Sequence, residues 1–252
     1  MGDWVRALPA QGAGSYAVGI DLSARRGLDL AVLDGRLQLV TLVHLQDLAA
    51  TLTWLDRQAP APLTIGIDAP QGPRLPLLTD SAVRAAILPP LTEGRYLRYR
   101  VCDYQLARRG IGLYLSPAAD EPVPSWIAVG FALFAALRER GFRAPRGPHD
   151  TAATLLEVYP YAAFVTLLGV TPPSKATPEG LAIRRYALES AGVTGLPAEM
   201  SHDALDAVAG ALASAAFAAG RGCALGDPME GLMVLPVPAE ALRDRYGRQK
   251  GS

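Results

Sequence analysis

The sequence has few cysteines, few lysines and no excess of either charge. Cys102 and Cys223 are its only cysteines and form no Cys-x-x-Cys pair, which excludes a disulfide scaffold and a zinc finger. We therefore expect reduced thiols in a cytoplasmic protein. Lys+Arg and Asp+Glu each number 24, so the formal net charge is zero. This balance argues against a protein that coats nucleic acid with positive charge, although it leaves room for a local basic face.

The sequence also lacks the features of secreted and membrane proteins. Residues 1–15 contain Asp3 and no apolar core, so we expect no signal peptide. The longest apolar segment, 204–219, is rich in alanine and carries Asp206, which indicates a helix of a soluble fold and no membrane span. Phosphate-binding glycine loops, Gly-x-Ser-x-Gly and His-Glu-x-x-His are missing too, which removes common nucleotide-binding, hydrolase and metalloprotease patterns.

The residues that are present predict a folded core with an α/β order of elements. Of the residues, 50% are hydrophobic and 19% are charged, which is typical of a globular chain. Apolar runs and helical spacing predict a β-β-β-α-β order: strands at 16–22, 28–33 and 36–43, a helix at 45–58, and a strand at 63–68. Asp34-Gly35 is a strong signal for the second hairpin turn. We expect a mixed sheet whose first three strands are antiparallel and whose fourth is parallel to the first.

The rest of the chain is expected to add helices on both faces of this α/β sheet. The segment 72–150 is predicted to be a helical insertion within a single domain, 1–252. The other predicted elements are helices at 95–109, 125–140, 178–190 and 201–219, a helix opened by Pro160, a strand at 154–159, and an edge strand at 232–235 after a turn at 226–231. Ser201 and Gly220 are the expected caps of the last helix, which has the clearest pattern.

Four aspartates form the candidate catalytic and metal-binding group. Gly-Ile-Asp occurs twice, and Asp21 and Asp68 each end a predicted strand. Neighbouring strands lie about 4.8 Å apart, so parallel pairing would bring the two carboxylates within reach of one metal ion. Asp203 and Asp206 share one face of the last helix, whose small residues allow it to lie close to the sheet. Four converging carboxylates suit Mg²⁺ or Mn²⁺ and two-metal hydrolysis of a phosphodiester.

Each of these aspartates also has an ordinary structural interpretation. Asp21 can cap the turn after its strand, and Asp68 can fold back onto the Ala69-Pro70 turn. Asp203 can stabilise the start of its helix through the helix dipole. Asp206 is harder to explain in this way, because it lies within an apolar helix.

Six short motifs follow one another along nearly the whole chain. They are Gly19-Ile20-Asp21, Ile67-Asp68-Ala69-Pro70-Gln71-Gly72, Arg100-Val101-Cys102-Asp103, Glu157-Val158-Tyr159-Pro160, His202-Asp203-Ala204-Leu205-Asp206-Ala207 and Gly226-Asp227-Pro228-Met229-Glu230-Gly231. In this order they resemble domain-of-unknown-function family 429 (DUF429), whose members are described as predicted nucleases of ribonuclease H-like fold. The resemblance implies a ribonuclease H-like sheet, which agrees with the β-β-β-α-β order.

The acidic pattern is also similar to that of Holliday-junction resolvases. These carry one acid on the first strand, one on the fourth, and an Asp-x-x-Asp-Ala pair on the last helix. The similarity implies catalytic roles for Asp21, Asp68, Asp203 and Asp206. Asp68 departs from the pattern, because resolvases usually have Glu at this place and the shorter arm alters the spacing of the metals. A homodimer is a further implication, since resolvase-like proteins are often dimers.

Three further residues are candidates for contacts with the metal or the substrate. Glu157 can be a fifth metal ligand, or a partly buried acid paired with an arginine. Arg100 lies in one of the motifs above, and arginine suits phosphate oxygens. Lys175, in a predicted loop, can bind an anion. Two arginine groups with nearby aromatic residues fit either a nucleic-acid groove or a solvated helix face: residues 95, 98, 100, 108 and 109, and residues 138, 140, 143 and 146.

Three classes of function remain open from the sequence. The first is a metal-dependent nuclease that acts on a nucleic acid of unknown kind. The second is a phosphotransferase of the related actin-like fold, which is disfavoured because the chain is short and lacks a glycine-rich adenosine loop. The third is a non-catalytic module that keeps the acids for structure. Stabilisation by Mg²⁺ or Mn²⁺ separates the third class from the others.

Overall fold

The first three strands form an antiparallel set that begins the central sheet. The computed structural model describes residues 15–23, 27–58, 63–87, 94 and 96–247. Strand β1 (Tyr16–Ser23) pairs with β2 (Gly27–Asp34), and β2 pairs with β3 (Leu39–Leu45). After helix α1 (Leu48–Gln58), strand β4 (Leu63–Ile67) returns parallel to β1. The strand directions predicted from the sequence are therefore confirmed.

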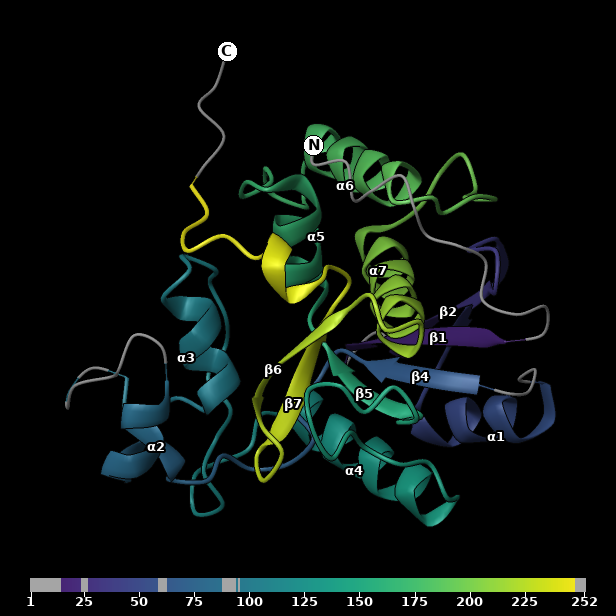
Figure 1. Ribbon diagram of the computed structural model, residues 1–252. Helices are drawn as coiled ribbons and strands as arrows, with labels where there is room; N and C mark the ends of the chain where they lie inside the picture. The colour runs from purple at the N-terminus through teal and green to yellow at the C-terminus, as the bar shows by residue number, and fades with distance from the viewer. Residues whose placement is uncertain (1–14, 24–26, 59–62, 88–93, 95, 248–252) are drawn as a thin grey trace.

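The full sheet has seven strands in the order β3-β2-β1-β4-β5-β7-β6 (Figure 1). Strands β5 (Leu155–Val158) and β7 (Gly231–Leu235) continue its parallel part, and β6 (Cys223–Asp227) closes it as an antiparallel edge. The remaining helices are α2 (Ser81–Ala86), α3 (Val101–Ala107), α4 (Ser125–Glu139), α5 (Pro160–Leu168), α6 (Pro178–Ser190) and α7 (His202–Ala218), with short 3-10 turns at Leu77–Thr79 and Ala239–Ala241.

Helices cover both faces of the sheet, as predicted (Figure 1). Along β1 the side chains alternate, so that Ala17 packs with α5, α6 and α7 while Val18 and Ile20 pack with α1 and α4. Asp21 is four residues from Ala17 and therefore lies on the face that α7 covers. A mixed sheet between two helical layers agrees with the ribonuclease H-like α/β fold.

The second hairpin turn is longer than the sequence predicts. The Asp34 carboxylate accepts hydrogen bonds from two backbone N–H groups of the turn, each at 2.9 Å, and so extends the turn. Strand β3 therefore begins at Leu39, three residues later than expected, and runs to Leu45. Helix α1 begins at Leu48 and not at residue 45, because the strand extends that far and the Asp47 carboxylate accepts a hydrogen bond from the first turn of the helix.

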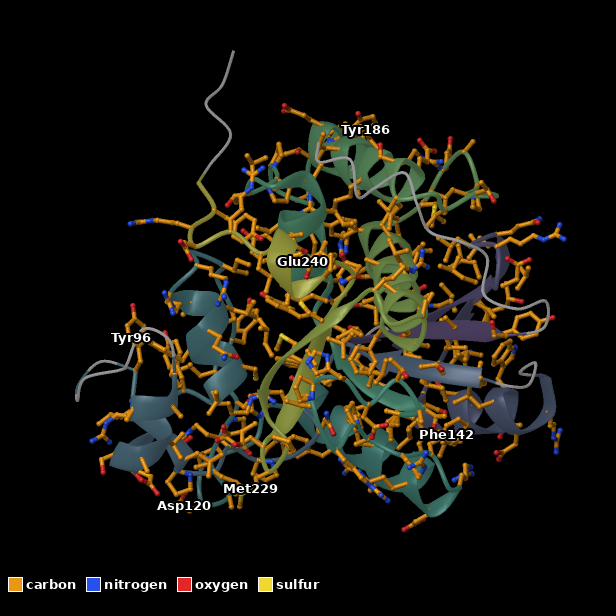
Figure 2. The ribbon with its side chains drawn as sticks, viewed as in Figure 1. Tyr96, Asp120, Phe142, Tyr186, Met229 and Glu240 are labelled. Carbon is orange, nitrogen blue, oxygen red and sulfur yellow. The ribbon has the colours of Figure 1, made fainter. Side chains whose placement is uncertain are left out.

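Sequence reasoning missed strand β6 and misplaced the edge of the sheet. The sequence predicts a turn over 226–231, whereas β6 extends through Asp227 and the turn comprises residues 228–230, with Met229 at its tip (Figure 2). Because β6 lies outside β7, the predicted edge strand at 232–235 is an inner strand. The Gln105 side chain accepts a hydrogen bond from the backbone N–H of Gly226 at 2.8 Å, so packing against α3 supports a strand whose residues favour turns.

Two other helices test the predicted boundaries. Helix α3 is shorter than the predicted 95–109, because the Asp103 carboxylate accepts a hydrogen bond from the backbone N–H of Arg100 and closes the N-terminus there. Residue 95 lies outside the described residues. Helix α7 has the predicted Ser201 N-cap, and Gly220 follows its end with a left-handed φ of 69°. In the part of the chain that the structure describes, no helix is both long and apolar enough to span a membrane.

Candidate functional site

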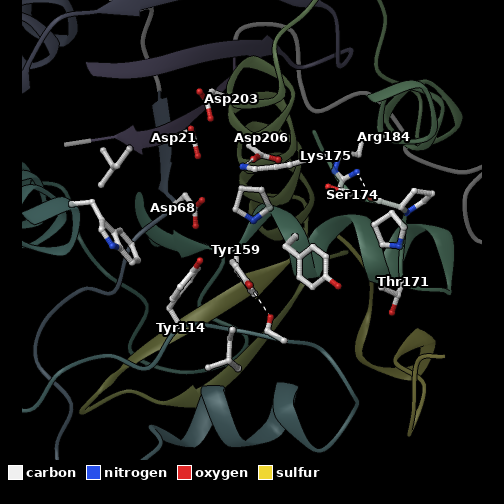
Figure 3. A pocket seen from close by; sticks show the side chains of 18 residues that line it. Asp21, Asp68, Tyr114, Tyr159, Thr171, Ser174, Lys175, Arg184, Asp203 and Asp206 are labelled. Carbon is white, nitrogen blue, oxygen red and sulfur yellow. Dashed lines mark hydrogen bonds and ion pairs between the residues drawn. The ribbon is translucent and has the colours of Figure 1, made fainter. Parts of the chain in front are cut away.

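The two Gly-Ile-Asp motifs allow α7 to lie directly on the sheet. Gly19 and Gly66 are paired across β1 and β4. A Cβ atom on Gly19 would lie 2.0 Å from the carbonyl oxygen of Ala207, and one on Gly66 would lie 2.3 Å from the hydroxyl of Ser214. At Gly19 the obstructing atom belongs to the backbone of α7, so the helix can keep its place only with glycine there, whereas at Gly66 the Ser214 side chain would have to move. The close approach brings the first turns of α7 beside the ends of β1 and β4 (Figure 3).

Four aspartates from these three segments line one cavity of about 1000 Å³ (Figure 3). Asp21 belongs to β1, Asp68 follows β4 directly, and Asp203 and Asp206 lie in the first two turns of α7. Asp21 is 7% exposed and Asp206 is 5% exposed. The structure therefore brings together the four residues that the sequence predicts to converge. Their roles in metal binding and catalysis stay predictions.

Burial makes Asp21, Asp68 and Asp206 weaker acids than usual. Burial, and after it the three neighbouring carboxylates, raise the pKa of Asp21 from its ordinary 3.8 to about 10. Burial and repulsion from Asp206 raise the pKa of Asp68 to about 7, although a hydrogen bond with Asp21 acts in the opposite direction. Burial also raises the pKa of Asp206 against the influence of Lys175. The cluster therefore retains protons near neutral pH unless a cation replaces them.

Lys175 is the cation that the chain itself brings to the cluster. Its Nζ lies 2.6 Å from Oδ2 of Asp206, and its side chain is 45% exposed. Burial alone would lower the pKa of Lys175, but the Asp206 carboxylate outweighs this effect and raises it, so the ammonium stays charged. Arg184 donates a hydrogen bond to the carbonyl oxygen of Pro173 at 2.9 Å and so holds the segment between α5 and α6 that carries Lys175. Arg184 also lines the cavity, and its charge favours the ionised form of Asp206, but two cations facing four carboxyl groups leave part of their potential charge unbalanced.

Sequence reasoning missed a fifth acid, Asp29. It lies directly opposite Asp21 in the antiparallel pair of β1 and β2, so both side chains are on the same face of the sheet. His44 of β3 lies beyond it, with Nδ1 3.3 Å from Oδ1 of Asp29. A sequence signal exists, because Asp29 is an acid inside an otherwise apolar strand. Its place opposite Asp21 depends on the length of the turn between the strands, which the apolar pattern does not specify.

Two overlapping sets of ligand atoms share Asp203. One set joins it with Asp21 and Asp29, and the other joins it with His202 and Asp206. Within each set the ligand atoms lie within 4.8 Å of one another. Carboxylate oxygens dominate both sets, which is the donor chemistry that Mg²⁺ and Mn²⁺ prefer. Asp68 is on the same cavity wall and completes the acidic group.

Glu157 and Arg100 belong to a second, fully paired group of charges. Nη1 and Nη2 of Arg100 donate to the two carboxylate oxygens of Glu157 at 2.9 and 2.7 Å. The same guanidinium donates to Asp103 through Nε and Nη2, at 3.1 and 3.0 Å. None of the three side chains is more than 2% exposed. Glu157 thus has the arginine partner that was one of its two predicted roles, and neither it nor Arg100 lines the four-aspartate cavity.

The predicted arginine groups are also engaged within the chain. Arg138 donates to the side chain of Gln71 at 3.1 Å, and Arg140 pairs with Asp56 at 3.0 Å. Arg95 lies outside the described residues. Among those arginines of the two groups that the structure describes, none lines the four-aspartate cavity. A basic groove built by these arginines stays a prediction.

Comparison with protein families matches residues 19–230 to a family described as a protein of unknown function, DUF429. The chain belongs to this family. The DUF429 match begins at Gly19, on which α7 rests, and it includes all four aspartates, Lys175 and the Arg100–Glu157 pair. The resemblance to DUF429 drawn from the six motifs is therefore confirmed. No curated protein and no solved structure matches the chain.

Proposed function

We propose that this DUF429 protein is a metal-dependent nuclease that hydrolyses phosphodiester bonds at the four-aspartate cavity. One observation carries the proposal. Three segments bring Asp21, Asp68, Asp203 and Asp206 into a single cavity in which Lys175 supplies one ammonium. Buried carboxylates that close repel one another strongly unless protons or cations join them. Mg²⁺ and Mn²⁺ are suitable cations, and two ions held by shared carboxylates suit phosphodiester hydrolysis.

The donor set fits two divalent cations. Asp203 is common to the two sets of ligand atoms, so it is the natural shared ligand, with Asp21 and Asp206 on either side of it. When bound, Mg²⁺ or Mn²⁺ would stabilise negative charge on the phosphate and lower the pKa of a water molecule. Lys175 would offer its ammonium to a phosphate oxygen. His44, which contacts Asp29, would orient that carboxylate from behind.

One observation favours a second candidate, a non-catalytic binding module. Lys175 already contacts Asp206, and its raised pKa keeps it charged, so part of the acidic cluster is neutralised without any metal. In such a module the aspartates would serve the fold and would neither bind Mg²⁺ or Mn²⁺ nor support hydrolysis.

Thermal unfolding with and without metal distinguishes the two candidates. We expect Mg²⁺ or Mn²⁺ to raise the melting temperature of the wild type by several degrees over its value in EDTA, because the ions bind only the folded state. Asp21→Asn should lose most of this increase. Asp120→Asn is the matched control, since Asp120 is an exposed acid remote from α7 and should keep the full increase (Figure 2).

Cleavage assays test the activity itself. The substrates are single-stranded, duplex and branched forms of DNA and RNA. We expect Asp21→Asn and Asp206→Asn to lower the metal-dependent rate about 100-fold or more, because changes even to the outer partners of a metal site cost about 10–100-fold. Undiminished cleavage by Asp21→Asn would refute the site. A wild type that neither gains stability from metal nor cleaves any substrate would favour the binding module.

A further inference from the structure

The cavity that the aspartates line also has aromatic side chains in its wall. Four rings line it: Tyr114, Trp126, Tyr159 and Tyr161. In the view of Figure 3, Asp68 stands between Asp203 on one side and the rings of Tyr114 and Tyr159 on the other. One continuous cavity therefore combines an acidic end, suited to metal-bound phosphate, with flat apolar surfaces.

Tyr114 is the most accessible of these rings. It is 80% exposed, and its ring contacts Trp126 edge to face with the centroids 6.1 Å apart. Leu115 and Val123, on the same stretch of chain, are 41% and 40% exposed. An aromatic ring this exposed at the wall of a cavity is available to a ligand.

The chain holds Tyr114 in this position from both sides. Before it, the hydroxyl of Tyr159 donates to the carbonyl oxygen of Gly112 at 2.7 Å. After it, the backbone N–H of Arg74 donates to the carbonyl oxygen of Pro117 at 2.8 Å. Tyr159 itself follows β5 and lies near Asp68, so the segment that carries Tyr114 is fastened to the sheet beside the acids. The ring is presented to the cavity by anchored backbone.

The chemistry of the two ends restricts the occupant. The acidic end, once it holds metal, attracts an anion, and Lys175 adds a positive charge there. The aromatic end favours a flat ring, and each face of a nucleobase can stack on Tyr, Trp or Phe. A nucleotide unit has both parts joined. In a duplex, however, both faces of each base are already stacked on neighbouring bases, so a base must be unpaired to reach Tyr114.

We propose that Tyr114, supported by Trp126, stacks on an unpaired base of the nucleic-acid substrate and so makes single-stranded or locally unpaired strands the preferred ligand. This inference rests on the proposed nuclease function, because it places the adjoining phosphate at the four aspartates. Tyr114 is thereby a specificity-determining residue, distinct from the acids. Its ring is the group required, and its hydroxyl is dispensable.

Binding measurements test the stacking contact without requiring cleavage. The probe is a fluorescently labelled oligothymidylate, compared with a labelled duplex, with Ca²⁺ in place of Mg²⁺. We expect Tyr114→Ala to weaken binding of the single strand roughly 5- to 100-fold, which is the range for loss of one base–aromatic stack. Tyr114→Phe should bind like the wild type. Tyr186→Ala is the control, since Tyr186 is 51% exposed on α6, outside the cavity, and should have no effect (Figure 2).

The outcomes separate this inference from the proposed function. Equal binding of the single strand by Tyr114→Ala and the wild type would overturn the stacking contact, as would wild-type preference for the duplex. Failure to bind any nucleic acid would overturn both proposals. If single-strand binding depends on Tyr114 but no substrate is cleaved with Mg²⁺ or Mn²⁺, the stacking contact stands and the nuclease activity fails. If cleavage depends on Asp21 and is indifferent to Tyr114, the nuclease activity stands and the stacking contact fails.

Discussion

Two buried acidic groups lie close together in this molecule, and they differ in how their charge is balanced. In the paired group, Arg100 donates two hydrogen bonds to Glu157 and two to Asp103. In the open group, four aspartates line a cavity and Lys175, which is 45% exposed, is their cationic contact. Both groups remove carboxylates from water, but only the first supplies enough hydrogen-bond donors in return.

The difference separates a structural role from a chemical one. Burial raises the pKa of Glu157 too, but the Arg100 guanidinium opposes that rise and gives both carboxylates of the paired group a hydrogen-bonded cation within the fold. Asp21 and Asp68 have pKa values raised to about 10 and about 7, although the Lys175 ammonium opposes both rises. Burial of a carboxylate is therefore a weak indicator of function by itself. Burial without compensating donors, at a cavity wall, is the stronger indicator.

The largest expected effect is on the paired group. Arg100→Met should destabilise the protein by about 3–5 kcal/mol, because Glu157 and Asp103 would then be buried without a cation. Denaturant unfolding at neutral pH measures this change. Arg140→Met, which breaks an exposed pair with Asp56, should cause a much smaller change. Similar losses in the two variants would mean that the paired group is not a structural one.

The pH dependence of stability should distinguish the open group. Asp68 has a folded pKa of about 7 against 3.8 for the unfolded chain, so the folded state binds more protons over this interval. The resulting stabilisation is complete below the unfolded value and is lost as the pH rises through about 7, and for Asp21 through about 10. In EDTA we expect the free energy of unfolding to fall by several kcal/mol between pH 5 and pH 9, because each group contributes about 1.4 kcal/mol per pH unit between its unfolded and its folded pKa.

Two controls assign that slope. Asp68→Asn should make it shallower, although not flat, because burial also raises the pKa of Asp21 to about 10 and that of Glu230 to about 7. In the wild type, saturating Mn²⁺ should reduce the fall of the free energy of unfolding with pH, since the cation takes the place of the protons. Stability that rises with pH in EDTA would contradict the raised pKa values of Asp21 and Asp68.

A smaller effect with a change of sign is expected for Asp21→Asn. In EDTA this variant should be as stable as the wild type or more stable by about 1 kcal/mol, because the buried Asp21 carboxyl must take up a proton on folding near neutral pH and an amide need not. In Mn²⁺ the order should reverse, because the variant lacks a ligand. Paired thermal melts under the two conditions measure both signs. A loss of stability in EDTA would place Asp21 with the structural acids.

The smallest expected effect concerns Lys175. Its ammonium lies 2.6 Å from Asp206 and repels an incoming cation. Lys175→Met should therefore bind Mn²⁺ about 3- to 10-fold more tightly in calorimetric titrations. Lys175→Arg keeps the charge and should retain wild-type affinity. Unchanged affinity in Lys175→Met would show that the open group is not sensitive to this cation.

The sequence predicted what local patterns and chain direction determine. The β-β-β-α-β order, the Ser201 cap and the convergence of the four aspartates all follow from apolar periodicity, capping residues and the parallel pairing of β1 with β4. Strand β6 was missed because Gly226 and Asp227 favour turns, and pairing with β7 overrides that preference. Such overrides depend on contacts that no local pattern records.

The parts of the site that escaped prediction depend on distances across the fold. Asp29 reaches Asp21 only through the register of a hairpin. The sequence allowed the prediction that an arginine pairs with Glu157, but it did not identify which one. Arg100 is 57 residues away in the chain, so the pairing depends on how α3 packs. Tyr114 lies in a loop without periodicity, so its exposure beside the acids was not visible in the sequence.

The contact of α7 with Gly19 and Gly66 sets the distance between the aspartates at the strand ends and those on the helix. Asp21 and Asp68 are fixed to the strands and Asp203 and Asp206 to the helix, so the gap between the two halves is the gap between two backbones. Backbones in hard contact cannot move closer, and they separate only if a methyl group is added. Substitutions in the outer helices would thus leave the spacing between the strand aspartates and the helix aspartates unchanged. Gly19→Ala would increase this spacing although all four aspartates are retained.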